Sequence, residues 1–178
     1  GNNNIFNLNT MTISLWYNEN SLPLPGSAHT MLSKSTSNNG EIGYRLEIAP
    51  DGLEYYVQSQ LGIIQPGTGF ITISNVIPNN WSLINIVKSV GTVNVYKNGQ
   101  NLGVNSNLYS SIINNSNLLF GAVTDQNLVS GFFNGKLDDI GIWNRALTQP
   151  EITQLYTTGQ ATYLWSNGET TPTINVTP

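Results

Sequence analysis

Residues Phe133 to Tyr156 read F-N-G-K-L-D-D-I-G-I-W-N-R-A-L-T-Q-P-E-I-T-Q-L-Y and decide the fold class of this chain. The first half of this stretch reads as a strand, in which successive side chains point to opposite faces. One face of this predicted strand would carry Leu137, Asp139, Gly141 and Trp143. The opposite face would carry Asp138, Ile140, Ile142 and Asn144.

The second half of the stretch predicts a short helix of about two turns. Thr148 and Glu151 have the spacing of a capping box, and Pro150 between them suits a first helical turn. One apolar face would follow, formed by Ile152, Leu155 and Tyr156. No helical period of useful length occurs before Thr148, so the rest of the chain should be β-structure.

Short alternating runs separated by turn signals fill the rest of the sequence. Thr10 to Tyr17 alternates cleanly, and Pro50-Asp51-Gly52 and Asn98-Gly99 are good turn signals. About ten short strands at such intervals indicate an antiparallel sandwich and not a βαβ fold. We expect Trp16, Trp81 and Trp143 to pack inside it.

The composition describes a folded domain with few charges. The chain has 178 residues, of which 39% are hydrophobic and only 9% are charged. Disorder normally combines low hydrophobicity with high charge, so this chain should fold. Its net charge of −4 and six Lys and Arg residues argue against nucleic acid as a partner. It has no cysteine, which excludes disulfides, and no long apolar run, so no membrane insertion is expected.

Three stretches together resemble the laminin-G-like, concanavalin A-like jelly-roll family. The first is Gly1 to Phe6 with Met11 to Tyr17, and the second is Trp81 to Val87 with Val93 to Gly99. The third is the closing strand and helix quoted above. Their order and spacing fit the family over residues 1–158. The resemblance implies an all-β, antiparallel β-sandwich jelly roll with one short C-terminal helix, a fold that binds or adheres more often than it catalyses.

Residues 159–178 are expected to be a linker and the start of a following module. Residues 161–178 resemble the opening of an immunoglobulin-like repeat of the PKD type, with Tyr163-Leu164-Trp165-Ser166 followed by Gly168 and Thr170. Neighbouring Ig-like domains in the same chain are the implied partners. The alternative is that this tail adds an edge strand to the jelly roll.

The sequence offers no obvious catalytic residues. Glycosidases need two carboxylates across a cleft, and the E-x-D-x-x-E and E-x-D-x-E patterns of laminarinase-type jelly rolls are absent. Glu41, Glu47 and Glu54 fall on separate strands or turns. His29 is the only imidazole and no G-x-S-x-G elbow occurs, so we interpret His29 as a residue at the start of a strand.

Calcium is the cofactor that the family resemblance implies. Many relatives hold this ion between the entry loop and the final strand, which by position points to Asn2, Asn3 and Asp139. Asn in place of Asp lowers the ligand charge and should weaken binding. The alternative is that Asp139 caps buried backbone amides without metal.

Exposed aromatic rings would carry ligand binding, because flat rings stack on the C–H faces of sugars at small entropic cost. Tyr55 and Tyr56 are adjacent, so one of them should face away from the core. Tyr109 lies in a segment rich in Asn and Ser, and one of the pair Phe132 and Phe133 should be exposed. The predicted ligand-binding residues are Tyr55, Tyr56, Tyr109 and Phe132, although such rings also cover core edges.

The sequence thus predicts a non-catalytic binding or adhesion module of a larger secreted bacterial surface protein, located outside the cell. Its expected partner is a glycan or a glycoconjugate of a cell surface. A structural spacer or protein-adhesive module without a small-molecule site is the alternative. A glycosidase is a third and less favoured one.

Overall fold

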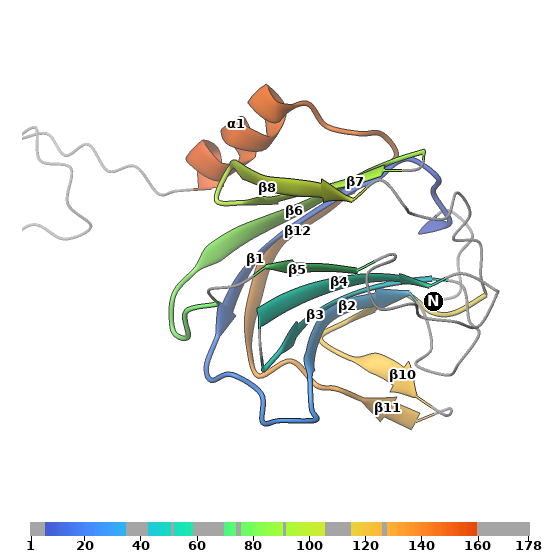
Figure 1. The fold of residues 1–178 in the computed structure, drawn as a ribbon, viewed down its shortest axis with the longest axis vertical. Helices are drawn as coiled ribbons and strands as arrows, with labels where there is room; N and C mark the ends of the chain where they lie inside the picture. Colours follow the sequence, from blue (N-terminus) through green and yellow to red (C-terminus); the bar gives the residue numbers. More distant parts are fainter. Residues whose placement is uncertain are drawn as a thin grey trace, which may run out of the picture.

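The computed structural model describes residues 6–34, 43–50, 52–58, 70–73, 76–90, 92–105, 115–125 and 128–159. Two five-stranded antiparallel sheets are stacked face to face, with a short hairpin and one helix outside them (Figure 1). Sheet A has the strand order β12-β1-β6-β7-β8, and sheet B has the order β5-β4-β3-β2-β9. The predicted antiparallel sandwich with one C-terminal helix is therefore confirmed.

The strands of sheet A are β1 (Met11–Glu19), β6 (Ser82–Ser89), β7 (Thr92–Lys97), β8 (Gln100–Asn105) and β12 (Gly135–Trp143). Those of sheet B are β2 (His29–Lys34), β3 (Gly43–Ala49), β4 (Gly52–Gln58), β5 (Phe70–Ile73) and β9 (Leu119–Phe120). The hairpin consists of β10 (Val123–Asp125) and β11 (Leu128–Ser130), and the helix is α1 (Gln149–Gly159).

The core lies between the two sheets and follows the alternation of the strands. In β1, the side chains of Met11, Ile13, Leu15 and Tyr17 are at most 1% exposed and belong to this core. Sheet B contributes aliphatic and aromatic residues from alternate positions of β3. They are Tyr44, Leu46 and Ile48.

Trp16, Trp81 and Trp143 do not pack between the sheets, which corrects our expectation for these three residues. Trp16 lies on the opposite face of β1 from the core residues, and its ring stacks on Tyr156 of α1 at 5.8 Å between centroids. Trp143 packs in a second, smaller cluster beneath the helix, and Trp81 is 40% exposed. The outer face of sheet A, with α1 over it, is thus a second apolar layer (Figure 1).

A β-bulge in β12 also corrects the predicted facing of that strand. Ser14 pairs with Gly141 and Trp16 with Asp138, so Leu15 alone opposes both Asp139 and Ile140. The extra residue reverses the alternation, because side chains change face at every position. Leu137 and Ile142, five residues apart, consequently both pack against the main core.

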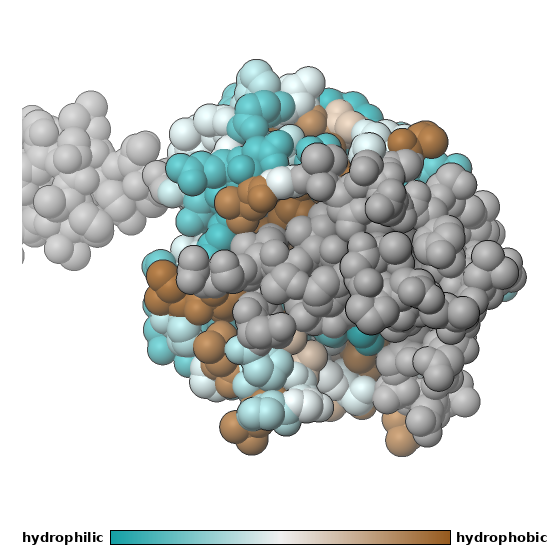
Figure 2. All heavy atoms as spheres, in the orientation of Figure 1, coloured by the Kyte–Doolittle hydropathy of each residue, from teal (hydrophilic) through white to brown (hydrophobic). Residues whose placement is uncertain are grey.

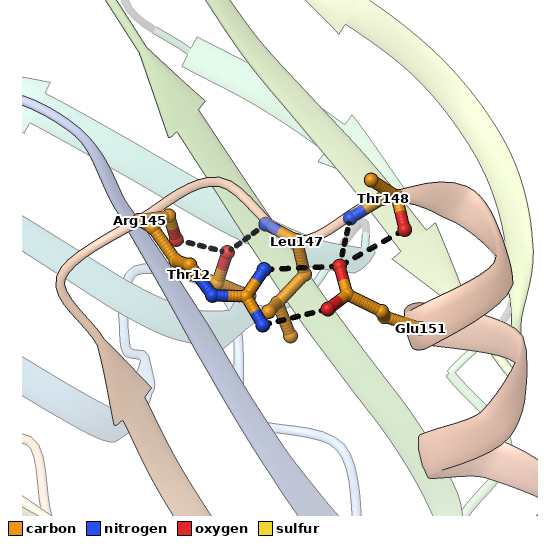
Figure 3. A network of polar contacts seen from close by, with 5 residues as sticks. All are labelled: Thr12, Arg145, Leu147, Thr148 and Glu151. Atoms are coloured by element: carbon orange, nitrogen blue, oxygen red, sulfur yellow. Dashed lines mark hydrogen bonds and ion pairs between the residues drawn. The ribbon is translucent and has the colours of Figure 1, made fainter.

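The helix cap has the predicted partners. The backbone amide of Thr148 donates to Glu151 Oε2 at 2.8 Å, and Arg145 adds a two-fold contact to the same carboxylate (Figure 3). The helix runs for 11 residues, somewhat longer than the two turns expected. Within the described ranges, it is too short and too polar to cross a membrane.

Candidate ligand-binding surface

The outer face of sheet B carries a buried network of polar side chains. Since Tyr44, Leu46 and Ile48 fill the core, the residues between them in β3, Arg45 and Glu47, project to the other side. Arg45 Nε lies 2.9 Å from Glu47 Oε2, and Thr30 Oγ1 of β2 donates to the same oxygen at 3.4 Å. Glu47 is only 5% exposed, so the contacts with Arg45 and Thr30 must replace the water that its carboxylate loses on burial.

The β10–β11 hairpin and its flanking residues lie against this face (Figure 1). Ser33 Oγ donates to the carbonyl of Ala122 at 2.9 Å, and the Thr30 amide donates to the carbonyl of Gly131 at 2.8 Å. Gly131 has φ +59°, and a Cβ there would lie 2.9 Å from Thr30 Oγ1. Only glycine therefore allows the hairpin to approach β2 this closely.

Phe132, a predicted ligand-binding residue, lies directly after this contact. It forms a parallel bridge with Thr30, and its side chain is 65% exposed. Its neighbour Phe133 packs against the core instead. An aromatic ring thus reaches solvent beside β2, one strand away from Arg45 and Glu47, while its role in ligand binding stays a prediction.

The strand register places the two predicted tyrosines at different positions of sheet B. Tyr55 is opposite Leu46, a core residue, and Tyr56 is opposite Arg45. The register position of Tyr56 therefore continues the row that Arg45 occupies on the polar face. Tyr109 lies outside the described residues.

The same register brings two acidic residues opposite each other, which the sequence pattern did not reveal. Glu47 of β3 pairs with Glu54 of β4, although the two are on separate strands as expected. Glu47 is already engaged by Arg45 and Thr30. A carboxylate held in this way is a structural anion and a poor candidate for the free acid or base of a glycosidase.

A hydrogen bond between a histidine and a buried carboxyl group lies at the start of β2. Nδ1 of His29 lies 2.7 Å from Oε1 of Glu19, the last residue of β1, whose side chain is fully buried. Burial raises the pKa of Glu19, while the hydrogen bond from His29 opposes this shift. His29 begins β2, as predicted, but nothing in the sequence indicated its partner, because Glu19 lies across the sandwich edge.

The predicted calcium ligands are only partly within the described residues. Asn2 and Asn3 lie outside them, and Asp139 lies in the bulge of β12 with φ +46°. The backbone amide of Asp139 donates to Asp138 Oδ1 at 2.9 Å. In the ranges that the structure covers, no three His, Asp or Glu side chains gather as a metal site would require. The carboxylate of Asp139 is a suitable calcium ligand, but six to eight oxygens are needed, so this site stays a prediction.

Hydrophobic residues also reach the surface in separate patches on the side that Figure 2 presents. The described residues of the β10–β11 hairpin include two exposed aliphatic side chains. Leu128 is 72% exposed and Val129 is 53% exposed. Together with Phe132, they make the hairpin an apolar rim beside the polar network.

The two stacked antiparallel sheets, closed by a short helix on one outer face, define a concanavalin A-like jelly roll. A laminin-G family model of the concanavalin A-like lectin/glucanases superfamily matches residues 1–153. The chain therefore belongs to this superfamily. A search of curated proteins finds no significant match.

Solved structures with the same fold include several from bacterial proteins. One is the CBM40 domain of the Ruminococcus gnavus IT-sialidase bound to α2,3-sialyllactose, with 17% identity, a TM-score of 0.65 and 85% coverage of each chain. A putative carbohydrate-binding protein from Bacteroides ovatus has 16% identity and a TM-score of 0.64, over 83% of this chain and 41% of that one. The binding domain of botulinum neurotoxin DC in complex with SialylT has 18% identity and a TM-score of 0.63, over 90% and 37%. This chain thus spans less than half of the latter two. At these identities the likeness establishes the fold.

Proposed function

We propose that this chain is a non-catalytic carbohydrate-binding module whose ligand contacts the outer face of sheet B. The observation that carries the proposal is the exposed ring of Phe132 beside the network of Thr30, Glu47 and Arg45. An exposed aromatic ring can stack on a sugar. Arg45, whose side chain is 18% exposed, can donate hydrogen bonds to the sugar hydroxyl groups, while the buried Thr30 and Glu47 hold the guanidinium in place. Three similar structures, described as carbohydrate-binding or shown with a sialylated glycan, support this class of ligand.

A glycan array probed with the purified chain tests the proposal, with Phe132→Ala as the decisive variant. Loss of the stacking ring should weaken binding by about tenfold, which corresponds to about 1.4 kcal/mol. Trp81→Ala is the matched control, because it removes another exposed aromatic residue that lies beside sheet A. Equal glycan binding by the wild type and Phe132→Ala would show that the ligand does not contact this face.

Protein adhesion is the second candidate function, and the apolar hairpin rim favours it. Leu128 and Val129 expose aliphatic side chains that sugars do not need, whereas protein partners bury such groups. An array without any bound glycan, together with capture of one defined protein that Leu128→Ser abolishes, would favour adhesion over sugar binding.

We also propose the calcium site of Asn2, Asn3 and Asp139 that the family resemblance implies. Calcium bound only to the folded state should raise the melting temperature, and a chelator should reverse the rise. Asp139→Asn should abolish the response, while Asp138→Asn should keep it. If neither calcium nor EGTA changes the melting temperature, Asp139 does not bind calcium.

The cellular setting is a further part of the proposal. A module of a larger, secreted, bacterial surface protein, followed at residues 159–178 by a linker and the start of an Ig-like module, should be found outside the cell in its native source. Immunodetection of the full protein in the surface fraction would agree with this setting, and its recovery from the cytoplasm would contradict it.

A further inference from the structure

A groove lies on the side of the molecule opposite to the proposed glycan face. It is bounded by α1 and by strands β1, β6 and β12, and it has a volume of about 380 Å³. Its lining includes Trp16, Trp143, Ser14, Asp139, Ile140 and Thr158. We call it the α1 groove. Its volume lies within the range of small-ligand pockets, about 300–1,000 Å³.

The two indole rings of this groove are fixed by specific contacts. Trp16 stacks on Tyr156 of the helix. The ring of Trp143 lies directly over Gly141, since a Cβ at Gly141 would be 2.4 Å from the ring atom Cη2. Neither ring needs to rearrange to meet a ligand, so binding would require little loss of side-chain entropy.

The bulge of β12 supplies the charge of the groove. Asp139 adopts φ +46°, a left-handed conformation that is uncommon outside glycine, and Asp139 also lines the groove. Bulges often redirect a side chain beside a functional site, and Asp tolerates this backbone conformation better than most residues. Among the described residues that line the groove, Asp139 is the only ionisable one.

Behind the wall that β1 forms in this groove lies a buried hydrogen-bond acceptor without a partner among the described residues. Ser14 lines the groove and accepts a 2.8 Å hydrogen bond from Nδ2 of the fully buried Asn85. Oδ1 of Asn85 is buried and receives no hydrogen bond from the described residues. Buried acceptors are rarely left in this state, so a polar group is expected close to Ser14 and Asn85.

We infer that the α1 groove is a second carbohydrate subsite, which takes one neutral sugar residue. The indoles would stack on its C–H face, and its hydroxyl groups would donate to the Asp139 carboxylate and exchange hydrogen bonds with Ser14. In the absence of calcium an acidic sugar is disfavoured, because its carboxylate would meet that of Asp139 and the described lining contains no Lys or Arg. The ligand class rests on the proposed function, but the surface is a different one.

The test is an NMR titration of the whole chain, in EGTA, with lactose, maltose, cellobiose, N,N′-diacetylchitobiose and 3′-sialyllactose. The indole N–H signals of Trp16 and Trp143 report on the groove. At least one neutral disaccharide should shift both signals, and 3′-sialyllactose should bind more weakly there. Asp139→Asn should lower the affinity about tenfold, because hydrogen bonds to a charged group are the stronger ones. Asp138→Asn should leave it unchanged.

A steric variant separates this inference from the proposed function. Thr158 is exposed and lines the groove, whereas its exposed neighbour Thr157 does not line it. Thr158→Trp should fill the groove and abolish the indole shifts, while Thr157→Trp should preserve them. Glycan binding that survives Thr158→Trp but is lost in Phe132→Ala, with no indole shift for any disaccharide, would overturn the α1 groove and keep the proposed function. If neutral disaccharides shift the indole signals but Phe132→Ala leaves glycan binding unchanged, the α1 groove is supported and the glycan site at Phe132 is overturned.

Discussion

The side chain of Thr12, in the second position of β1, accepts a 2.9 Å hydrogen bond from the backbone amide of Leu147, which lies 135 residues further along the chain (Figure 3). The same hydroxyl donates to the carbonyl of Arg145 at 2.9 Å. Both backbone groups belong to the loop between β12 and α1. The Thr12 hydroxyl thus holds the loop that precedes α1, and this loop positions the helix over the outer face of sheet A.

Replacement of Thr12 by Val should lower the free energy of unfolding by about 2 kcal/mol, because the buried amide of Leu147 would lose its acceptor. Val keeps the shape of Thr but has no hydroxyl. Urea unfolding measures the loss. Thr12→Ser retains both hydrogen bonds and should cost clearly less, so equal losses for Val and Ser would show that the bonds do not matter.

The cap of α1 should respond to acid in a defined range. Hydrogen bonds from Arg145, and then from Thr148, lower the pKa of Glu151 from 4.5 to about 2. A lowered pKa means that this carboxylate stabilises the fold above pH 4.5, and that the contribution is lost as the pH falls towards 2. An NMR titration should find the Glu151 midpoint at about 2 in the wild type and closer to 4.5 in Arg145→Gln. Lys136→Gln, a change at a distant exposed cation, should not move it.

The sequence predicted the parts of this fold that depend on local rules. Alternation placed Met11, Ile13, Leu15 and Tyr17 in the core, and the spacing of Thr148 and Glu151 placed the helix cap. Hydrophobicity alone could not distinguish the two buried layers, one between the sheets and one beneath α1. Trp16 and Trp143 were therefore assigned to the wrong layer.

The candidate sites were harder to predict, because they depend on register. Nothing in Asp138-Asp139-Ile140 signals that Leu15 will oppose two residues, so the bulge that brings Asp139 into the α1 groove was not foreseen. The pairing of Glu47 with Glu54 likewise depends on how β3 and β4 align. Phe132 was selected from its sequence context, and its exposure follows from the burial of Phe133.

The pair of Glu19 and His29 should give a pH dependence of the opposite sign to that of Glu151. Burial raises the pKa of Glu19 above 4.5, so the folded state holds this proton more tightly than the unfolded state. The stabilisation from the neutral form is complete below pH 4.5 and is lost as the pH rises through the folded-state pKa.

Glu19→Gln removes this titration. The difference in melting temperature between Glu19→Gln and the wild type should therefore shift in favour of the variant as the pH is raised above 4.5. Calorimetry of both proteins across this range gives the difference. Glu151→Gln provides the contrast, since its difference from the wild type should change only below pH 4.5. A difference for Glu19→Gln that is constant with pH would mean that Glu19 ionises in the fold as it does in the unfolded chain.

Gly141 should tolerate no side chain while Trp143 lies over it. A Cβ at this position would come within 2.4 to 3.1 Å of three atoms of the indole ring, and the neighbouring strand β1 blocks a sideways shift through its pairing with Ser14. Gly141→Ala should therefore cost about 1–3 kcal/mol, as is usual when a packed site is overfilled. Urea unfolding again gives the value.

The double variant Gly141→Ala with Trp143→Leu tests whether the ring is the cause. The smaller leucine side chain would leave room for the new methyl group, so the combined loss should be smaller than the sum of the two single losses by at least about 0.5 kcal/mol. Additive losses would instead place the strain in the backbone of β12. Coupling would establish that Gly141 holds Trp143 flat, which is the arrangement on which the α1 groove depends.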